Sequence, residues 1–324
     1  MRILLALLCA GAVVGGCTPA TERGAVASSA PAPGPAASAA DSGWRVQSKT
    51  DLGGAEAYGL AVTEDTVWAV SYQAGTLVRV NVDDGAVVAT IPLAGQPASL
   101  LSAAGSLWVA AYGGHLYRLD AAAGSVTADV PEVGEICCDL SFGGGLVWAL
   151  NPAGFLLGVD PVTAVVAKRY PVPVNRNAHS NVVFAGNSVW VASDGGPMLQ
   201  IDPKTGNSTQ VDVGGGVPFF ARGARLWGAD ATAVWALDPA TAKVVQRVAL
   251  TDSAEVMALA VDGNTLWAGI RHPGRIGAVQ RIDLGTGRVL AESRDITIPA
   301  RIEIGHGSVW ITDSGSSLLW RVVR

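Results

Sequence analysis

This sequence of 324 residues lacks several features that would indicate a function. It has no run of Lys or Arg and a net charge of −5. We therefore do not expect nucleic acid as a partner, because phosphate binding requires clustered cations. No apolar stretch reaches the roughly 20 residues that a membrane-spanning helix requires. No Ser/His/Asp constellation, phosphate-binding loop or pair of carboxylates at a recognisable spacing is present, so we assign no catalytic residue and no cofactor.

The first 16 residues are typical of a bacterial signal peptide. Arg2 gives a minimal positive charge, and an apolar stretch follows from Ile3 to Val14. The stretch ends in Val14-Gly15-Gly16-Cys17, which resembles the bacterial lipobox, in which the cysteine is lipidated and becomes the mature N-terminus. Small residues are needed there because the signal peptidase accepts only short side chains beside the cut. We therefore expect residues 1–16 to be removed and Cys17 to carry the lipid; the alternative is an ordinary secretory signal with a different cut.

Residues 17–42 consist mainly of Ala, Ser, Pro and Gly and contain few bulky apolar side chains. Such a segment buries too little surface to offset the entropy that it would lose on ordering, so we expect a disordered tether. The folded part is then residues 43–324, which a lipid anchor would hold outside the cytoplasm, on the bacterial cell membrane or envelope.

A short motif occurs seven times in the folded part: a small or aliphatic residue, then Trp, then small apolar residues. Successive tryptophans are 40, 40, 42, 37, 40 and 43 residues apart. We expect these side chains to pack between repeats rather than to form a sugar-binding surface. The seven tryptophans are Trp68, Trp108, Trp148, Trp190, Trp227, Trp267 and Trp310.

A second pattern keeps the same phase. An Asp or Asn ends a short apolar stretch, and a Gly or Ala follows four residues later. Several copies resemble Asp-Pro-x-Thr-Gly, and these are the residue types that tight hairpin turns need. The pairs are Asn81/Gly85, Asp120/Gly124, Asp160/Ala164, Asp202/Gly206, Asp238/Ala242 and Asp283/Gly287.

A period near 40 residues, with several short apolar strands in each repeat, predicts the blades of a β-propeller. We expect an all-β, seven-bladed β-propeller with four-stranded blades, in which the repeated Trp lies on the second strand. The last repeat stops after its third strand, Leu318 to Val323, and an extra strand, Trp44 to Thr50, precedes the first. We expect this N-terminal strand to complete the last blade and so to close the ring.

The motifs Gly-x-Ser-Val/Leu-Trp-Val/Ala and Ile-Asp-Pro-x-Thr-Gly resemble those of the bacterial propellers grouped as virginiamycin B lyase-like, YVTN or NHL repeats, over residues 44–324. The resemblance implies the propeller fold, whereas propellers serve binding, scaffolding and catalysis alike. The lyase opens a cyclic antibiotic with the help of a metal, and its relatives usually carry Phe-Thr-Glu where this chain has Trp-Val/Ala-Ala/Ser. That motif is absent, and no position matches the lyase's His and Glu pair, so the resemblance does not imply lyase activity.

Two connections that we expect at the mouth of the central channel are longer than their counterparts, and loops on a rigid scaffold often carry function. We expect them to face each other across the mouth and to recognise an anionic or polar ligand. The alternative is loop variation without function. The candidate residues are Asn175, Arg176 and His179 in one loop and Arg271, His272 and Arg275 in the other.

Four polar residues share one phase, nine residues before the Trp of their repeat, where we expect the channel entrance. A buried charge there needs a partner, so Asp139 and Arg301 could pair across the channel or through water. The alternative is a solvated channel lining. The four residues are Ser99, Asp139, Asn181 and Arg301.

Two adjacent cysteines, Cys137 and Cys138, precede Asp139. An exported protein favours oxidation, and adjacent cysteines can form a disulfide ring that distorts the peptide unit between them. Side chains of neighbouring strand residues, however, point to opposite sides, so two unlinked and partly buried cysteines are the alternative. A metal site formed by Glu135, a cysteine, Asp139 and His179 matches no standard ligand spacing, and we assign no metal.

Three hypotheses for the function follow. The first is a propeller without catalytic activity that binds a small ligand or an envelope protein through its channel-mouth face. The second is an enzyme related to the lyase or to quinone-dependent dehydrogenases, which also use propellers. The third is an envelope sensor or assembly scaffold that binds another protein through its broad faces. The regular repeats and the lack of a catalytic motif favour the first.

Overall fold

The computed structural model describes residues 43–136, 139–173, 180–193, 196–213, 225–230, 232–250, 255–271 and 276–323. The described residues all belong to one compact unit, Ala39–Arg324. None of these residues is helical, and they accordingly include no helix that is long and apolar enough to cross a membrane.

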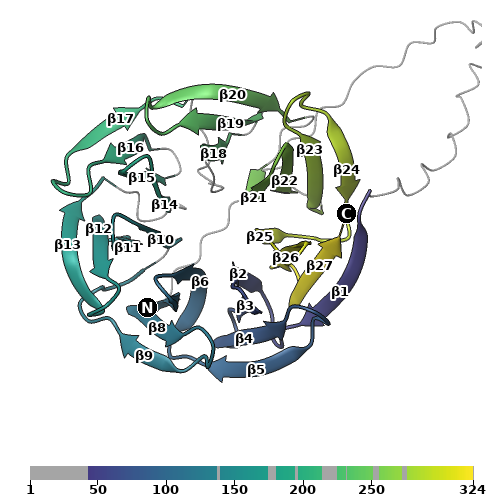
Figure 1. Ribbon diagram of the computed structural model, residues 1–324, viewed down its shortest axis with the longest axis horizontal. Coiled ribbons are helices and arrows are strands. Elements are labelled where there is room, and N and C mark those ends of the chain that lie inside the picture. The colour runs from purple at the N-terminus through teal and green to yellow at the C-terminus, as the bar shows by residue number, and fades with distance from the viewer. Residues whose placement is uncertain are drawn as a thin grey trace, which may run out of the picture. The chain divides into compact units, whose positions relative to one another are not determined.

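The described residues form seven antiparallel sheets arranged as blades around a common axis (Figure 1). Neighbouring strands in a blade are neighbours in sequence except where the first strand joins the last blade, and each blade runs from an inner strand to an outer one. Blades 1 to 3 consist of β2 (Ala57–Val62), β3 (Thr66–Ser71), β4 (Thr76–Asn81) and β5 (Val87–Pro92); β6 (Gln96–Ala103), β7 (Ser106–Tyr112), β8 (His115–Asp120) and β9 (Val126–Asp129); and β10 (Ser141–Gly143), β11 (Leu146–Asn151), β12 (Phe155–Asp160) and β13 (Val165–Pro171).

The remaining blades follow the same order. Blade 5 has three described strands, and residues 214–224, which precede them, lie outside the described part. Blades 4 to 7 consist of β14 (Ser180–Ala185), β15 (Ser188–Ser193), β16 (Met198–Ile201) and β17 (Ser208–Val211); β18 (Leu226–Ala229), β19 (Ala233–Asp238) and β20 (Lys243–Ala249); β21 (Glu255–Asp262), β22 (Thr265–Arg271), β23 (Ala278–Asp283) and β24 (Val289–Ser293); and β25 (Pro299–Gly305), β26 (Ser308–Asp313), β27 (Leu318–Val323) and β1 (Arg45–Asp51).

The N-terminal strand closes the ring, as the sequence predicts. Strand β1 pairs with β27 from Arg45↔Val323 to Asp51↔Leu318, and it begins one residue later than expected. Trp44, just before it, is buried, and its ring centroid lies 5.0 Å from that of Trp267 in blade 6. The two ends of the folded chain therefore share one sheet, which protects an edge that an open ring would expose.

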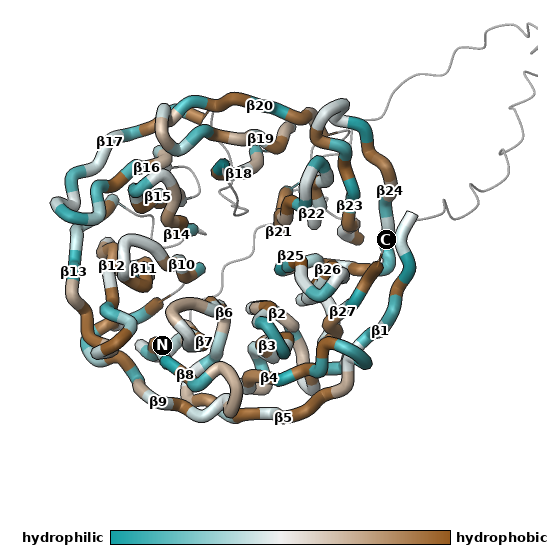
Figure 2. The backbone as a smooth tube through the Cα atoms, viewed as in Figure 1, coloured by the Kyte–Doolittle hydropathy of each residue, from teal (hydrophilic) through white to brown (hydrophobic). Residues whose placement is uncertain are grey.

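Burial in each blade falls from the inner strands to the outer strand. All six residues of β3 are buried, whereas β5 is exposed or half-buried along its whole length. Inner strands have a neighbouring blade on each face and therefore read as continuous apolar sequence. Outer strands have one wet face, and Figure 2 shows both hydropathy colours along outer strands such as β20.

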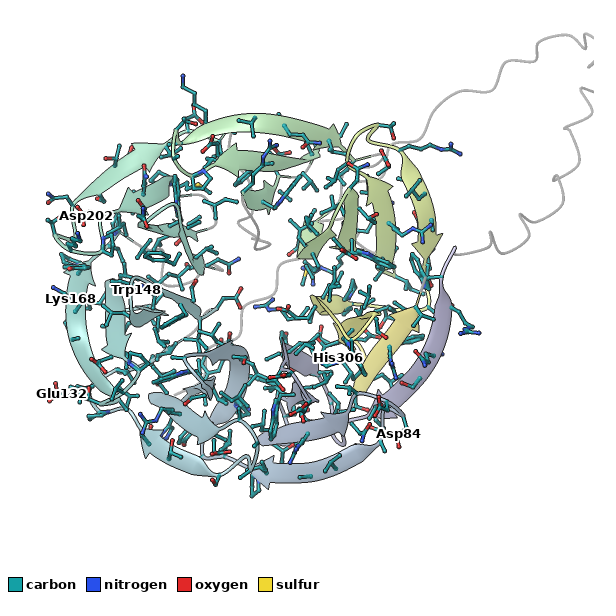
Figure 3. The ribbon with its side chains drawn as sticks, in the orientation of Figure 1. Asp84, Glu132, Trp148, Lys168, Asp202 and His306 are labelled. Carbon is teal, nitrogen blue, oxygen red and sulfur yellow. The ribbon has the colours of Figure 1, made fainter. Side chains whose placement is uncertain are left out.

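The repeated tryptophans pack each blade against the next. All seven have at most 5% of their surface exposed. Trp148 of blade 3 packs with Val189, Val191 and Ile201 of blade 4, and Figure 3 shows Trp148 inside its blade and Lys168 on the rim. Trp310 of blade 7 packs in the same way with residues of blade 1. The predicted role of the tryptophans between repeats is confirmed.

The repeated Asp or Asn begins a tight turn between the third and fourth strands. In blade 2, Asp120 Oδ1 accepts the N–H groups of Ala122 and Ala123 at 2.9 and 2.7 Å, and the Gly124 N–H donates to the Asp120 carbonyl at 2.8 Å. The residue that closes the turn has positive φ in each of the six copies. These residues are Gly85, Gly124, Ala164, Gly206, Ala242 and Gly287.

Candidate functional site

The connections between blades, and those between the second and third strands, lie at one end of the channel. Strand β2 begins at Ala57, which pairs with Ser71 at the end of β3. Strand β6 begins at Gln96, which pairs with Tyr112 at the end of β7. The Asp and Asn turns lie at the opposite ends of the strands. We call the first end the mouth face and the second end the turn face.

A β-bulge near the start of the inner strand recurs in four blades. The register shifts between Ala57 and Leu60 in β2, Pro97 and Ser99 in β6, Val256 and Ala258 in β21, and Pro299 and Arg301 in β25. A bulge re-aims the side chains beside it. The shift falls at the position that the sequence indicated for the channel entrance, nine residues before the Trp, so the bulge helps to set the direction of the side chain there.

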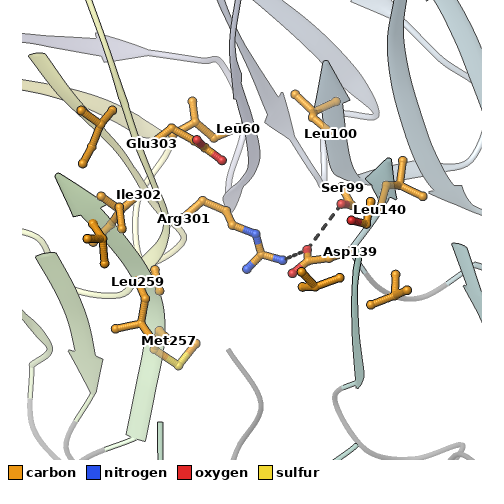
Figure 4. Close-up of a pocket in the computed structure, with 17 residues that line it drawn as sticks. Leu60, Ser99, Leu100, Asp139, Leu140, Met257, Leu259, Arg301, Ile302 and Glu303 are labelled. Atoms are coloured by element: carbon orange, nitrogen blue, oxygen red, sulfur yellow. Dashed lines mark hydrogen bonds and ion pairs between the residues drawn. The ribbon is translucent and has the colours of Figure 1, made fainter. Parts of the chain in front are cut away.

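Arg301 and Asp139 form an ion pair across the channel (Figure 4). Arg301 comes from the inner strand of blade 7, and Asp139 directly precedes the inner strand of blade 3. The Ser99 hydroxyl, from blade 2, donates to Asp139 Oδ1 at 3.4 Å. Arg301 Nη1 also donates to the Ala300 carbonyl at 2.9 Å. Two arrangements were expected, direct pairing across the channel and pairing through water, and the structure adopts direct pairing.

This ion pair borders a cavity of about 220 Å³ in the channel. Beside the pair, most of the lining is aliphatic and comes from the innermost parts of six blades. The side chains of Arg301 and Asp139 keep 30% and 27% of their surface exposed, so water reaches both. The cavity therefore combines aliphatic side chains with the charged bridge and with the carboxylate-bearing Glu303. Its aliphatic residues include Leu60, Leu100, Leu140, Val182, Leu259 and Ile302.

The other candidates from the sequence divide into two groups. Arg271 ends β22, and its Nε donates to Glu255 Oε2 at 2.9 Å, so its charge is already paired within blade 6. Asn181 is buried in β14, next to the cavity residue Val182. The remaining candidates lie outside the described residues, so the expected facing of the two loops stays a prediction. They are Cys17, Cys137, Cys138, Asn175, Arg176, His179, His272 and Arg275.

Within the described part of the chain, no group of three or more His, Cys, Asp or Glu side chains is placed to hold a metal ion. Glu135 and Asp139 are described, but the two cysteines and His179 of the site considered above are not. Glu135 instead accepts the Gly113 N–H at 3.1 Å through Oε2, which ties it to blade 2.

The mouth face also carries a row of three tyrosines that was not predicted from the sequence. The ring centroids of Tyr58 and Tyr72 lie 5.4 Å apart, and those of Tyr72 and Tyr112 lie 5.9 Å apart with an interplanar angle of 85°. Tyr58 and Tyr112 keep 36% and 37% of their surface exposed. The sequence contains a signal for this row, because Tyr72 and Tyr112 both lie four residues after the Trp of their repeat. Arg271 occupies the same position in blade 6.

The mouth-face charges act on these phenols. Burial raises the pKa of Tyr58 above its ordinary value, the carboxylate of Glu56 adds to the rise, and Arg301 and Arg271 oppose it. Burial also raises the pKa of Tyr112, with smaller contributions from the other two tyrosines and from Glu135. The phenols of Tyr58 and Tyr112 therefore stay protonated at neutral pH and remain hydrogen-bond donors.

Comparison with known proteins supports the fold and no finer grouping. No protein-family model matches the chain, and no curated protein matches it in sequence. Among solved structures, the computationally designed Ika8 protein aligns with a TM-score of 0.64 and 14% identity, over 84% of this chain and 98% of that one. BamB from Moraxella catarrhalis aligns with a TM-score of 0.59 and 11% identity, over 87% of this chain and 100% of that one. At these identities the likeness shows a β-propeller and nothing more specific.

Proposed function

We propose that this protein is a membrane-tethered extracytoplasmic β-propeller that binds a ligand or a protein partner through its mouth face. The observation that carries the proposal is the gathering of exposed aromatic and charged side chains on this face. Tyr58, Tyr72 and Tyr112 lie there together, near the ion pair of Arg301 and Asp139. The blade interfaces, in contrast, bury one Trp from each of the seven repeats.

Physical reasoning supports binding at this face. Tyr and Arg are enriched at protein interfaces, where an aromatic body and a polar tip both find contacts. A concave apolar site with a few convergent polar groups is the usual place for a small ligand. The mouth face offers both kinds of surface, and the fold of BamB or of a designed propeller adds no more specific role.

The proposal of a tether rests on the sequence of the first 42 residues. We expect the Cys17→Ser variant to leave the membrane fraction and to appear as soluble exported protein, because it has lost the residue that carries the lipid. Fractionation of cells followed by detection of the protein checks this. A variant that stays in the membrane fraction would contradict the lipid anchor, and a Cys9→Ser variant, changed inside the apolar stretch, serves as the control.

We also propose that the chain is a divergent relative of the virginiamycin B lyase-like, YVTN and NHL-repeat propellers. The tryptophan and Asp-Pro motifs alone support this, so it adds nothing to the functional assignment.

The mouth face is tested by photo-crosslinking in intact cells. A photoreactive amino acid replaces Tyr112 in one strain and Val162 in another. Val162 is 81% exposed and belongs to the Asp160 turn on the turn face, so this control position lies on the opposite face and is more accessible than Tyr112. We expect a defined protein adduct, or a small-molecule adduct visible by mass spectrometry, from position 112 only. Adducts from position 162 alone, or from neither position, would contradict the proposal.

A further inference from the structure

We propose that the tyrosine row of Tyr58, Tyr72 and Tyr112 receives Lys or Arg side chains carried by an extended segment of a partner protein. This inference rests on the proposed function and names the chemistry of the partner. It follows from the orientation of the three rings, from the two carboxylates held beside them, and from the position of the exposed rings outside the channel cavity.

The ring orientations suit a cation. Tyr58 and Tyr72 are tilted by 59°, and Tyr72 and Tyr112 by 85°, so the three rings turn their faces in different directions. A cation is attracted to the face of an aromatic ring within about 6 Å of its centroid. A cationic head at this row can therefore contact more than one ring.

Backbone contacts hold two carboxylate-bearing residues beside the row. The Glu56 carbonyl accepts the Tyr72 N–H at 3.0 Å, and Glu56 itself has a positive φ of 63°. At the other end, Glu135 Oε2 accepts the N–H of Gly113, the neighbour of Tyr112, at 3.1 Å. Among the described residues neither glutamate belongs to an ion pair, while Arg271 and Arg301 do. Each of the two arginines thus faces an opposite charge, whereas the carboxylate at each end of the row belongs to no ion pair among the described residues.

The phenol hydroxyls of the row differ from those of the other two tyrosines in the chain. Tyr117 donates to the Ala94 carbonyl at 3.1 Å, and Tyr170 donates to the Pro203 and Lys204 carbonyls at 3.0 Å. No hydrogen bond from the hydroxyls of the row is found within the described residues. They remain available to the backbone carbonyls that would flank a bound Lys or Arg.

The surface suits a polypeptide better than a free small cation. Steps of 5.4 and 5.9 Å carry the row across blades 1 and 2, and an extended chain advances about 3.3 Å per residue. None of the three tyrosines lines the 220 Å³ cavity in the channel. The row thus lies outside that cavity with both of its ends exposed, and an extended segment can follow it from Glu56 to Glu135.

The small number of tyrosines makes a direct test practical. The full-length protein, in detergent, is labelled with 3-fluorotyrosine, and its five tyrosines give five ¹⁹F signals. Single Tyr→Phe variants assign these signals. The probe is an acetylated and amidated peptide, Gly-Arg-Gly-Lys-Gly, and the matched control peptide carries Glu in place of Arg and Lys. We expect saturable shifts at Tyr58, Tyr72 and Tyr112 with the basic peptide only, while Tyr117 and Tyr170 stay unchanged.

Charge variants sharpen the test. We expect the double variant Glu56→Gln/Glu135→Gln to bind the basic peptide about fivefold more weakly, since each interaction at an exposed site is modest. Glu64→Gln removes one charge of the same kind from an exposed hairpin on the turn face and is expected to leave the affinity unchanged. Unchanged circular dichroism shows that the variants remain folded.

Three outcomes would overturn the inference: equal shifts with the acidic peptide, shifts at Tyr117 and Tyr170 as large as those of the row, or no shift at all. Shifts with chitotetraose but not with the basic peptide would indicate a glycan surface instead. These failures are distinguishable from failure of the proposed function, because adducts from position 112 in cells would still show a partner at the mouth face.

Discussion

Two positions of the same repeat differ in how far their residue type varies: the repeated Trp does not vary, whereas the position nine residues before it, which we call the channel phase, does. Every repeat has Trp at the blade interface, and the structure buries all seven of these side chains. Nine residues earlier, the same repeats have Gly59, Ser99, Asp139, Asn181, Pro218, Ala258 and Arg301. A position that must fill one fixed space admits one residue type, whereas a position that borders the channel cavity can differ in each blade. The repeated Trp indicates how the ring is held together, and the position that varies between repeats indicates where function can reside.

We expect the largest loss in the free energy of unfolding from a change in the tryptophan layer, which does not vary between repeats. Replacement of Trp148 with Ala removes a fully buried ring that packs on blade 4 and donates through Nε1 to the Gly143 carbonyl at 3.0 Å. We expect the free energy of unfolding to fall by about 3–5 kcal/mol, as measured by denaturant unfolding. Trp148→Phe keeps most of the volume and should lose clearly less. A loss below about 1 kcal/mol for the Ala variant would break the comparison.

The turn face offers a graded test between equivalent positions. A Cβ on Gly124 would lie 2.5 Å from Ile91 Cδ1 and 2.8 Å from Trp68 Cη2, at a φ of 71°. We therefore expect Gly124→Ala to destabilise the protein by about 1–3 kcal/mol. Thermal unfolding monitored by circular dichroism measures the change.

The reverse change at the equivalent turn of blade 5 should stabilise the protein. Ala242 already has a φ of 56°, which strains a residue with a Cβ. We expect Ala242→Gly to raise the free energy of unfolding by up to about 1 kcal/mol, because relief of the strain exceeds the added entropy of the unfolded chain. A destabilised Ala242→Gly variant in the same thermal assay would show that the methyl contact outweighs the strain.

A smaller effect is expected in the channel. Arg301 and Asp139 bridge two blades, yet both keep more than a quarter of their side chains exposed. Solvent screens such a pair, so we expect a coupling of less than about 1 kcal/mol in a double-mutant cycle with Arg301→Gln and Asp139→Asn. A coupling as large as the loss from Trp148→Ala would mean that the channel phase is structural, which would remove the contrast on which the proposed function rests.

Among the single substitutions, we expect the smallest change in stability from the loss of a charge in the Asp turns, and this change should appear as a weaker pH dependence of unfolding. Hydrogen bonds from backbone N–H groups hold the pKa of Asp120, Asp160 and Asp202 below the ordinary 3.8. A depressed pKa in the folded state adds stability above pH 3.8, and this stability is lost as the pH falls through the lowered value. We expect Asp120→Asn to reduce this acid dependence, because Asn81 makes the same turn in blade 1 without a charge. An unchanged acid profile in pH-dependent unfolding would contradict this.

Much of the architecture could be predicted because it repeats. Seven tryptophans in phase and six Asx turns define seven blades, and the incomplete last repeat predicts that β1 completes blade 7. The pairing of Asp139 with Arg301 was also within reach, since their shared phase places both at the channel. Which of the two possible arrangements forms, direct or through water, depends on β-bulges that the residue pattern does not show.

The tyrosine row was missed for a different reason. Its members come from three separate segments, and only Tyr72 and Tyr112 share a phase. Tyr58 joins them because the bulge in β2 lies beside it and because blades 1 and 2 approach closely at Gly59, where a Cβ would lie 2.8 Å from the Ala98 carbonyl oxygen. The loops with Asn175 and His272 lie outside the described residues, so their predicted role stays a prediction.

The most direct test of the central claim measures binding and stability on one variant. Tyr58→Ala/Tyr112→Ala removes the two exposed ends of the row, and a photoreactive residue at the exposed Gln96 reports on the partner in cells. The account predicts that the adduct is lost while the free energy of unfolding falls by less than half of the Trp148→Ala loss. An adduct that persists, or a loss of stability equal to that of Trp148→Ala, would contradict the assignment of binding to the mouth face.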